Sequence, residues 1–349
     1  MLKETLSASK IKTLKSCSWQ YWCKYHLKLP DKTNSGALKG EIVHLVLECL
    51  GHARHKKHYD LIIKKKDIFA SAAIQRLVDK HIKKKSLEDP EHLDDICEMA
   101  YKGLLYDFFG KKYGKPTEVV SEKDFEIVIQ EQEVAYKIKG FIDKLFIYGN
   151  HSAVLIRDYK TNKKKYEGKE ITDNLQDYIY TLAIRKLYPD IKDITMEFLF
   201  LKQDLDDGGV MPMQPKTKYE LVGFEHELTA YQKYADTFTE KTATSNLAAL
   251  QGMPKDGSFS GKLLCGFASK PNELKKDGTP KWCCTYKFPF EYFAVIDKDK
   301  KIKKTAFTKK ELSNYPLQKD DKIEKRKYAG CPAFNKVKDD FDDFDLDKF

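Results

Sequence analysis

The stretch GFIDKLFIYGNHSAVLIRDYKTN (residues 140–162) consists of two apolar segments joined by a short polar turn. This pattern predicts two antiparallel strands that form a hairpin in the core of the fold. Each strand carries one aspartate where a buried strand normally has a hydrophobic residue: Asp143 in the first and Asp158 in the second. Lys160 follows the second aspartate by two positions. Two carboxylates and an amine in a core hairpin require a chemical explanation.

Hairpin geometry predicts that these three side chains share one face. Residues two apart on a strand point the same way, so Asp158 and Lys160 lie on one side of the sheet. If the GNHS segment forms the loop, Tyr148 pairs with Ala153. Asp143 then lies directly opposite Asp158, with Cβ atoms about 5 Å apart. A two-residue Gly-Asn turn makes the pair diagonal but keeps both aspartates on the same face.

The chemistry of such a pair suggests a divalent metal ion. Two neighbouring carboxylates repel each other unless a proton or a cation lies between them. Oxygen ligands of this kind suit Mg²⁺ or Mn²⁺. An ammonium group beside the metal can orient a water molecule for hydrolysis of a phosphodiester. The alternative is that Asp143 and Asp158 are salt-bridge partners at a strand end, with Lys160 as one of their partners.

Two neighbouring segments extend the pattern. Gln176 and Tyr180 are four residues apart in a predicted helix that follows the second strand, so they share one helical face. Upstream, Gly40 and His44 belong to the segment GEIVH, in another predicted helix. A lone histidine is more often a core or surface residue than a ligand, but this one belongs to a series of motifs.

The order G-x-x-x-H, G-x-x-D, D-x-K and Q-x-x-x-Y resembles the RecB-like branch of the PD-(D/E)XK nuclease superfamily. This branch includes the CRISPR-associated four-cysteine exonucleases and many phage exonucleases. The resemblance covers roughly residues 5 to 205, and the opening segment SASKIKTLKSCSWQYWCKYHLKLP is also similar to the start of the family. It implies an α/β fold: a restriction-endonuclease-like mixed β-sheet flanked by helices, with an N-terminal helical part.

For the metal site, the resemblance implies that Asp143 and Asp158 bind the catalytic Mg²⁺ or Mn²⁺, with His44 as a further ligand. Many relatives have glutamate where this chain has Asp158, so this ligand has a slightly shorter reach. Glu122 and Glu48, the latter one turn after His44, are additional carboxylates in the same part of the chain. Both are reserve carboxylates: a solvated or structural role is expected for them, and a role as a metal ligand is the alternative.

For catalysis, the resemblance implies that Lys160 positions the attacking water and stabilises the charge that develops on the phosphate. Gln176 and Tyr180 are expected to maintain the geometry of the site and to contact DNA. Three lysines directly follow the catalytic strand: Lys163, Lys164 and Lys165. They form either a solvated surface or a contact with the DNA backbone, where point charges are favourable.

The eight cysteines indicate free thiols or metal ligands rather than disulfides if the chain is intracellular. Several members of the family bind a [4Fe–4S] cluster through one cysteine before the nuclease core and three after it. The matching candidates here are Cys17, Cys265, Cys284 and Cys331. The count permits a cluster, but the late cysteines, with Cys283 included, are 18, 1 and 47 positions apart, whereas the family has a compact group. Zinc is a lesser alternative, and Cys49 and Cys97 are expected in the core.

The length of 349 residues suffices for one large domain with insertions or for two domains. The predicted organisation is a nuclease domain in residues 1–250, with a helical insertion at about 50–115, and a cysteine-containing C-terminal extension in residues 251–335. Within this frame, three strands are predicted in 118–161 and a helix over 226–250. Few regular elements are expected beyond residue 250.

The net charge of +10 is distributed unevenly along the chain. From Asp339 onward there are six aspartates and one lysine, so the rest of the chain carries about +15. A basic body suggests a polyanionic partner, and a solvated lysine-rich surface is the alternative. The acidic tail, residues 336–349, is predicted to be disordered. It resembles the tails by which single-stranded DNA-binding proteins dock onto replication or recombination partners; a solubilising role is equally open.

Together these features predict a metal-dependent DNA exonuclease that acts at DNA ends in recombination, repair or phage replication. The alternatives are a structure-selective endonuclease of the same fold and a non-catalytic DNA-binding assembly factor. The chain has no apolar run of 18 or more residues and no signal-peptide core, so no membrane association is expected. The predicted location is the cytoplasm, or the host cytoplasm if a phage encodes the chain.

Overall fold

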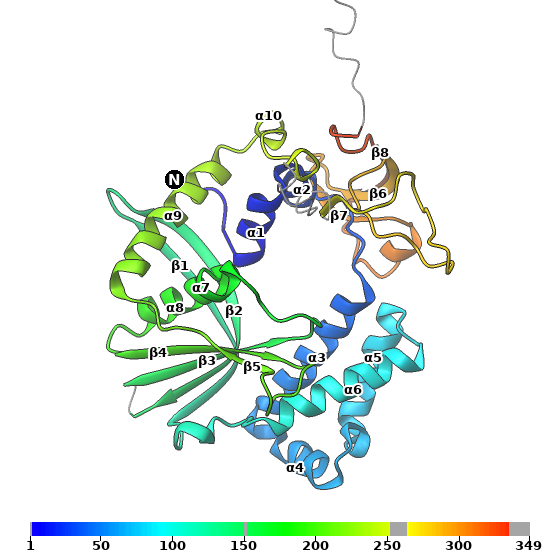
Figure 1. Ribbon diagram of the computed structural model, residues 1–349. Coiled ribbons are helices and arrows are strands. Elements are labelled where there is room, and N and C mark those ends of the chain that lie inside the picture. Colours follow the sequence, from blue (N-terminus) through cyan, green and yellow to red (C-terminus); the bar gives the residue numbers. More distant parts are fainter. Residues whose placement is uncertain (1, 150–151, 252–263, 335–349) are drawn as a thin grey trace, which may run out of the picture. The chain divides into compact units, whose positions relative to one another are not determined.

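The computed structural model describes residues 2–149, 152–251 and 264–334 (Figure 1). Its internal contacts divide the chain into two units, of which the first contains Met1–Ala8 and Thr33–Asp236 and the second contains Ser9–Lys32 and Thr237–Phe349. The N-terminal helices therefore group with the C-terminal part of the chain, across the boundary expected at residue 250. None of the helices in the described ranges combines the length and apolar composition needed to cross a membrane.

The helical part of the first unit is a group of four helices that pack on one another (Figure 1). They are α3 (Ser35–Gly51), α4 (Lys56–Lys65), α5 (Ala72–Lys85) and α6 (Pro90–Leu105). Side-chain caps define their starts: Asn34 accepts a hydrogen bond from the first turn of α3, Ser71 from α5 and Asp89 from α6. Their apolar faces form one buried cluster that also includes Tyr159 and Leu199 from the sheet. This cluster fixes α3 against the strands.

The first unit also contains a mixed five-stranded sheet with the order β1-β2-β3-β4-β5. The strands are β1 (Glu118–Gln130), β2 (Ala135–Tyr148), β3 (Ala153–Lys160), β4 (Asp193–Phe200) and β5 (Val210–Pro212). Only β3 and β4 run parallel, and the remaining neighbours are antiparallel. The three strands predicted within 118–161 are confirmed, as is the α/β class: the fold is a mixed sheet flanked by helices, consistent with a restriction-endonuclease-like fold.

A helical connection joins β3 to β4, as parallel neighbours require. It contains α7 (Lys169–Thr172) and α8 (Leu175–Leu187), and α9 (Lys218–Asp236) follows β5. The helix predicted over 226–250 is therefore misplaced: it starts earlier and ends at Asp236. Asn174 caps α8 by accepting hydrogen bonds from the backbone of Gln176 and Asp177, which fixes the first turn of this helix beside β3.

The register of the β2–β3 hairpin agrees with the prediction. Tyr148 pairs with Ala153, and the paired series runs to Lys144 and Arg157. The next positions in this series are Asp143 and Asp158. Because successive residues of a strand point to opposite faces, Lys144 and Arg157 lie behind the two aspartates.

The second unit contains almost all of α1 (Ala8–Ser16), followed by α2 (Ser18–Tyr21), a π-helical turn (Trp22–His26) and α10 (Glu240–Ala243). It also contains an antiparallel sheet of order β7-β6-β8, with β6 (Phe290–Ile296), β7 (Ile302–Ala306) and β8 (Lys322–Tyr328). The expectation of few regular elements beyond residue 250 is therefore wrong. The many lysines of β7 and β8, among them the adjacent pair Lys303 and Lys304, hid the strands in the sequence. The indole of Trp19 donates a hydrogen bond of 2.7 Å to the Tyr328 hydroxyl, which ties α2 to β8.

Candidate active site

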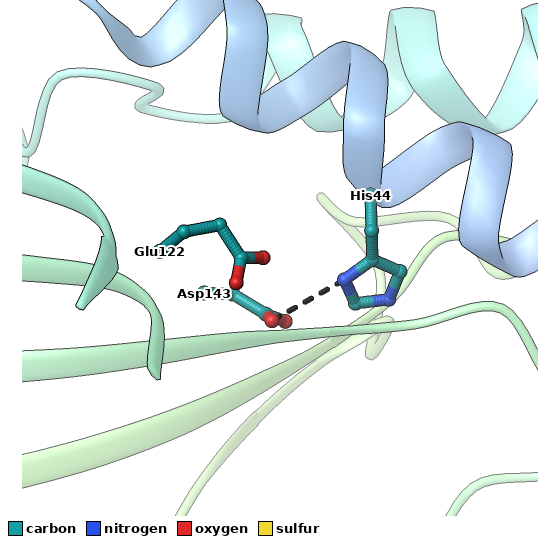
Figure 2. Close-up of side chains that lie close together, drawn as sticks. All are labelled: His44, Glu122 and Asp143. Carbon is teal, nitrogen blue, oxygen red and sulfur yellow. Dashed lines mark ion pairs between the residues drawn. The ribbon is translucent and has the colours of Figure 1, made fainter. Parts of the chain in front are cut away.

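Strand β2 and helix α3 of the first unit bring two predicted ligands together, Asp143 and His44. His44 on α3 points toward Asp143 on β2, and its Nδ1 atom lies 3.3 Å from Asp143 Oδ1 (Figure 2). The other carboxylate oxygen of Asp143 accepts a 2.8 Å hydrogen bond from the backbone N–H of Tyr159. This bond ties the Asp143 side chain to β3 next to Asp158, so one oxygen orients the carboxylate and the other faces the histidine.

Glu122 on β1, one of the two reserve carboxylates, completes the group. His44, Glu122 and Asp143 each offer one potential metal-binding atom, and these three atoms all lie within 4.8 Å of one another (Figure 2). They are the group of potential metal ligands that the described residues form at this distance. Glu122 lies between the paired positions Ser121 and Lys123 of β1, so it is opposite Asp143. The position of Glu122 beside Asp143 and His44 favours the ligand role of this reserve carboxylate over a solvated one.

The backbone at Glu122 is unusual. Its φ angle of 51° is in the left-handed region, which is uncommon for a residue with a side chain. Such a conformation costs about 1–3 kcal/mol and persists only where the surrounding structure imposes it. Pairing with β2 continues on both sides of Glu122, so the strand does not end here. The distortion is local, at the point where β1 presents a carboxylate to Asp143.

The electrostatics of the group favour a cation. Burial would lower the pKa of His44, but the charge of Asp143 and its hydrogen bond outweigh burial and raise it to about 9. Burial and the charges of Asp143 and Glu48 raise the pKa of Glu122 to about 7. Protons on these groups offset the carboxylate charge, as expected when acids are close together. A divalent cation can take the place of those protons, and one nitrogen with two carboxylates is a donor set that fits Mn²⁺ or Mg²⁺.

Asp158 and Lys160 form a second, connected cluster on β3. Lys160 Nζ lies 2.6 Å from Asp158 Oδ2 and donates a 2.7 Å hydrogen bond to Gln176 Oε1. The Gln176 amide nitrogen donates to Asp158 Oδ1 and, over 2.8 Å, to the Tyr180 hydroxyl. Both ends of the Gln176 amide are thus occupied, which orients it and holds the aspartate and the lysine in place.

The protonation of this cluster follows from burial and from pairing. Asp158 is 2% exposed, and burial raises its pKa, against the effect of Lys160. Burial would lower the pKa of Lys160, but the negative charge of Asp158 outweighs it and the pKa is raised. Lys160 is therefore a stable cation at neutral pH, and Asp158 faces this cation instead of joining the three-ligand group.

Gly40 explains how α3 comes close enough to deliver His44. A Cβ atom at this position would lie 2.6 Å from the Thr161 hydroxyl oxygen, which directly follows β3. Any larger residue would push the helix and the strand end apart. The G-x-x-x-H pattern thus combines a close helix–strand approach with a histidine one turn later.

A family model of the PD-(D/E)XK nuclease superfamily matches residues 5–262. The chain belongs to the PD-(D/E)XK nuclease superfamily. Comparison with curated proteins gives no match. The matched range includes every residue of the two clusters, and metal-dependent cleavage of nucleic acids is the activity that the superfamily suggests. The candidate metal group lies where the D and D-x-K motifs of this PD-(D/E)XK chain meet.

Other predicted residues of this superfamily member lie apart from the metal group. The three lysines after β3 are exposed: Lys163, Lys164 and Lys165. Lys165 donates a 2.8 Å hydrogen bond to the carbonyl of Gly208. Cys49 and Cys97 pack at the edge of the helical core, as predicted. The acidic tail, residues 336–349, lies outside the described residues.

The four predicted cluster cysteines are brought together in the second unit. Cys17 contributes to raising the pKa of Cys265, Cys284 and Cys331, Cys265 contributes to raising that of Cys284 and Cys331, and Cys331 contributes to raising that of Cys284. Burial first, and then the neighbouring thiols, raise the pKa of Cys284 to about 12 and that of Cys331 to about 11. Cys283 is not part of this set and instead pairs with Gly266 in a short bridge.

Lys287 links the segments that carry the three late cysteines. Its N–H donates to the carbonyl of Cys284 over 3.0 Å, and its carbonyl accepts from the N–H of Cys331 over 3.3 Å. Its buried ammonium donates to the carbonyls of Gly266 and Ala268, next to Cys265, over 3.1 and 2.7 Å. Lys287 therefore connects the three chain segments that carry Cys265, Cys284 and Cys331.

The spacing of the sulfurs bears on the kind of metal that they can hold. Ligand atoms of one ion lie close together, since zinc–sulfur bonds are about 2.3 Å long. The close donor group in the described residues contains no cysteine. An iron–sulfur cluster with one iron for each thiolate holds its ligands farther apart.

Proposed function

We propose that this chain is a metal-dependent deoxyribonuclease, acting as an exonuclease on DNA ends. The observation that carries the proposal is the convergence of two acidic clusters from adjacent strands: His44, Glu122 and Asp143 beside Asp158 and Lys160. A buried pair of aspartates beside a permanent cation has no evident purpose in stabilising a sheet. It matches the needs of phosphodiester hydrolysis, in which negative charge must be neutralised.

Each residue has a role that follows from its surroundings. His44, Glu122 and Asp143 would hold the divalent ion, which when bound polarises the phosphate and lowers the pKa of a coordinated water. Lys160 stays charged, so it cannot serve as a base; it donates hydrogen bonds to the water and to the developing phosphate charge. Asp158 holds Lys160, and we propose it as a further ligand that would exchange its contact with Lys160 for one with the ion.

The helix α8 supports this arrangement from the side. Gln176 holds the orientation of Asp158 and Lys160, and Tyr180 fixes the Gln176 amide in turn. We assign these two residues to positioning of the cluster, and we propose that they also contact DNA.

The decisive experiment compares substrates with and without ends. With Mn²⁺ or Mg²⁺, wild-type protein should degrade labelled linear DNA and leave circular single-stranded DNA intact, whereas Asp158→Ala should degrade neither. Cutting of the circle would favour the alternative, a structure-selective endonuclease. If wild type and Asp158→Ala behave alike, the remaining alternative, a non-catalytic DNA-binding assembly factor, is favoured. Asp190→Asn, at an exposed acid away from both clusters, is the matched control.

We further propose that the chain belongs to the RecB-like branch and acts in recombination, repair or phage replication, in the cytoplasm of its cell or host. The order of the four short motifs supports this assignment. The acidic tail, residues 336–349, is proposed to dock onto a replication or recombination protein. Deleting the tail should leave cleavage of a short oligonucleotide unchanged and abolish binding to such a partner.

A second proposal concerns the second unit, where Cys17, Cys265, Cys284 and Cys331 would ligate a [4Fe–4S] cluster. The electrostatic influence of these thiols on one another supports it. Protein purified without oxygen should show a broad absorption band near about 400 nm and contain iron and sulfide. Cys283→Ser should keep the band, because Cys283 is not in the set, and Cys284→Ser should lose it.

A further inference from the structure

The metal group lies in a cleft whose second wall comes from the helical insertion. The cleft has a volume of about 640 Å³, and its lining includes His44 and Glu122 of the metal group. It also includes Glu41 on α3 and three residues of α5: His81, Lys84 and Lys85. These three are spaced i, i+3 and i+4, so they occupy one face of the helix. A helix with no part in the catalytic motifs thus faces the metal group.

The two lysines on this wall differ in whether they form an ion pair. Lys85 forms an ion pair with Glu41 across the cleft. Within the described part of the chain, Lys84 has no ion-pair partner, although it is exposed in the same lining. His81 has its pKa lowered, first by burial and then by the lysines around it, so it is a neutral hydrogen-bonding group at neutral pH. Lys84 is therefore the cation available to a ligand.

An ordinary structural explanation exists for these lysines. Basic residues in the last turn of a helix interact favourably with the helix dipole, and the last turn of α5 contains Lys83, Lys84 and Lys85. That explanation applies equally to all three. It does not distinguish Lys83, which is exposed but outside the cleft lining, from Lys84. The comparison of these two neighbours therefore separates the two explanations.

We propose that Lys84 and His81 bind a backbone phosphate of the DNA strand next to the scissile phosphate. The proposal rests on the proposed nuclease function and adds a substrate-binding wall to it. In the part of the chain that the structure describes, the lining contains no phenylalanine, tyrosine or tryptophan. The wall therefore offers charge and hydrogen bonds to phosphates and no stacking platform for bases, so binding is independent of sequence. Lys85 also binds the phosphate when the phosphate displaces Glu41 from its ion pair with this lysine.

The test measures binding of a 5′-labelled single-stranded oligonucleotide by fluorescence anisotropy, with Ca²⁺ in place of Mg²⁺ to prevent cutting. Lys84→Ala should weaken binding about tenfold, the effect of losing one charged contact. The slope of log Kd against log salt should also fall by about 0.7. Lys83→Ala should change neither quantity. Glu41→Gln should tighten binding, because it releases Lys85.

Cleavage assays with Mn²⁺ separate this proposal from the proposed function. Lys84→Ala should raise KM and leave kcat near the wild-type value. Equal binding by Lys84→Ala and Lys83→Ala, whether both are unchanged or both are weakened, overturns the wall while leaving the nuclease assignment intact. If wild type cuts no DNA but the Lys84 and Lys83 variants still differ in binding, the nuclease assignment fails and the wall remains. Thermal unfolding followed by circular dichroism confirms that both variants fold.

Discussion

Lys160 Nζ lies 2.6 Å from Asp158 Oδ2, and the two residues are two positions apart on the same strand. The two side chains share a face and are held together by the amide of Gln176, so neither depends on a distant element for its position. This local pairing keeps the lysine charged despite its burial. An ammonium held in this way is preorganised for the charge that develops during phosphodiester cleavage.

Lys160→Met should therefore reduce cleavage by about 10²- to 10⁴-fold, the range measured when a preorganised charged donor is removed. DNA binding in Ca²⁺ should change little, because the lysine acts on the reacting phosphate. Rates are measured on linear DNA with saturating Mn²⁺. Lys169→Met, at an exposed lysine on α7, is the control. Cleavage at the wild-type rate by Lys160→Met would remove the lysine from the mechanism.

Glu122→Gln should weaken Mn²⁺ binding about tenfold or more, since it removes one charged ligand from the group. Isothermal titration calorimetry without DNA measures this directly and does not depend on activity. Glu126→Gln, at an exposed glutamate on the same strand, should bind Mn²⁺ like the wild type. Indistinguishable affinities for the two variants would exclude Glu122 from the site.

His44 should set the preference between metals. A nitrogen ligand suits Mn²⁺ better than Mg²⁺, which prefers oxygen donors. Wild-type protein should cut DNA faster with Mn²⁺ than with Mg²⁺ at equal saturation, and His44→Asp should reduce or reverse that ratio. Metal titrations of initial rates give both saturation and ratio. An unchanged ratio in His44→Asp would show that the imidazole does not contact the ion.

Asp95 on α6 should stabilise the fold in a pH-dependent way. Hydrogen bonds from Lys39 and Lys202 lower its pKa to about 2. A lowered pKa stabilises the folded state above the unfolded value of about 3.9, and the contribution is lost as pH falls through about 2. With 31% of this side chain exposed, screening limits the expected effect to about 1 kcal/mol.

Urea denaturation of Asp95→Asn should thus show a loss of stability at neutral pH that shrinks as the pH approaches 2. Asp94→Asn, at the exposed neighbouring acid, should show no such loss. A pH-independent difference between wild type and Asp95→Asn would mean that packing, and not the ion pairs, is responsible.

Lys287→Met should lower the iron and sulfide content of anaerobically purified protein. Methionine fills a similar volume but leaves the carbonyls of Gly266 and Ala268 without their donor, so the segment of Cys265 loses its anchor. Absorption near about 400 nm per polypeptide reports occupancy. Lys327→Met, at an exposed position of β8, is the control. Full occupancy in Lys287→Met would mean that the cysteines find each other without this anchor.

The local parts of the fold and site could be predicted from the sequence, because short-range geometry determines them. The β2–β3 hairpin has a short turn and a clear period of two, so the positions of Asp143 and Asp158 followed from counting residues. The position of Glu122 opposite Asp143 could have been predicted in the same way, by counting residues back from the turn. The turn after β1 is closed by a hydrogen bond from Glu131 to Val134, and counting back along the pairing series gives Glu122 opposite Asp143.

Non-local features were not predictable in this way. The gathering of Cys17 with cysteines more than two hundred positions later depends on packing within the second unit, and no periodicity records it. The role of Lys287 is equally invisible, since a buried lysine that donates to backbone carbonyls looks like any other lysine in a basic chain. The wall formed by α5 depends on how the helical core packs against α3.

The hairpin that opened the sequence places opposite charges back to back: Asp143 precedes Lys144, and Arg157 precedes Asp158. Both basic side chains are almost fully buried, and Arg157 is neutralised by Glu197 at 2.6 Å. Sliding one strand by a single position would turn the carboxylate of that strand inward and present its basic neighbour to the metal. The number of residues between Tyr148 and Ala153 must therefore stay even if both aspartates are to keep facing the site. Natural variants of this protein should gain or lose residues there in twos, unless a bulge absorbs the odd one.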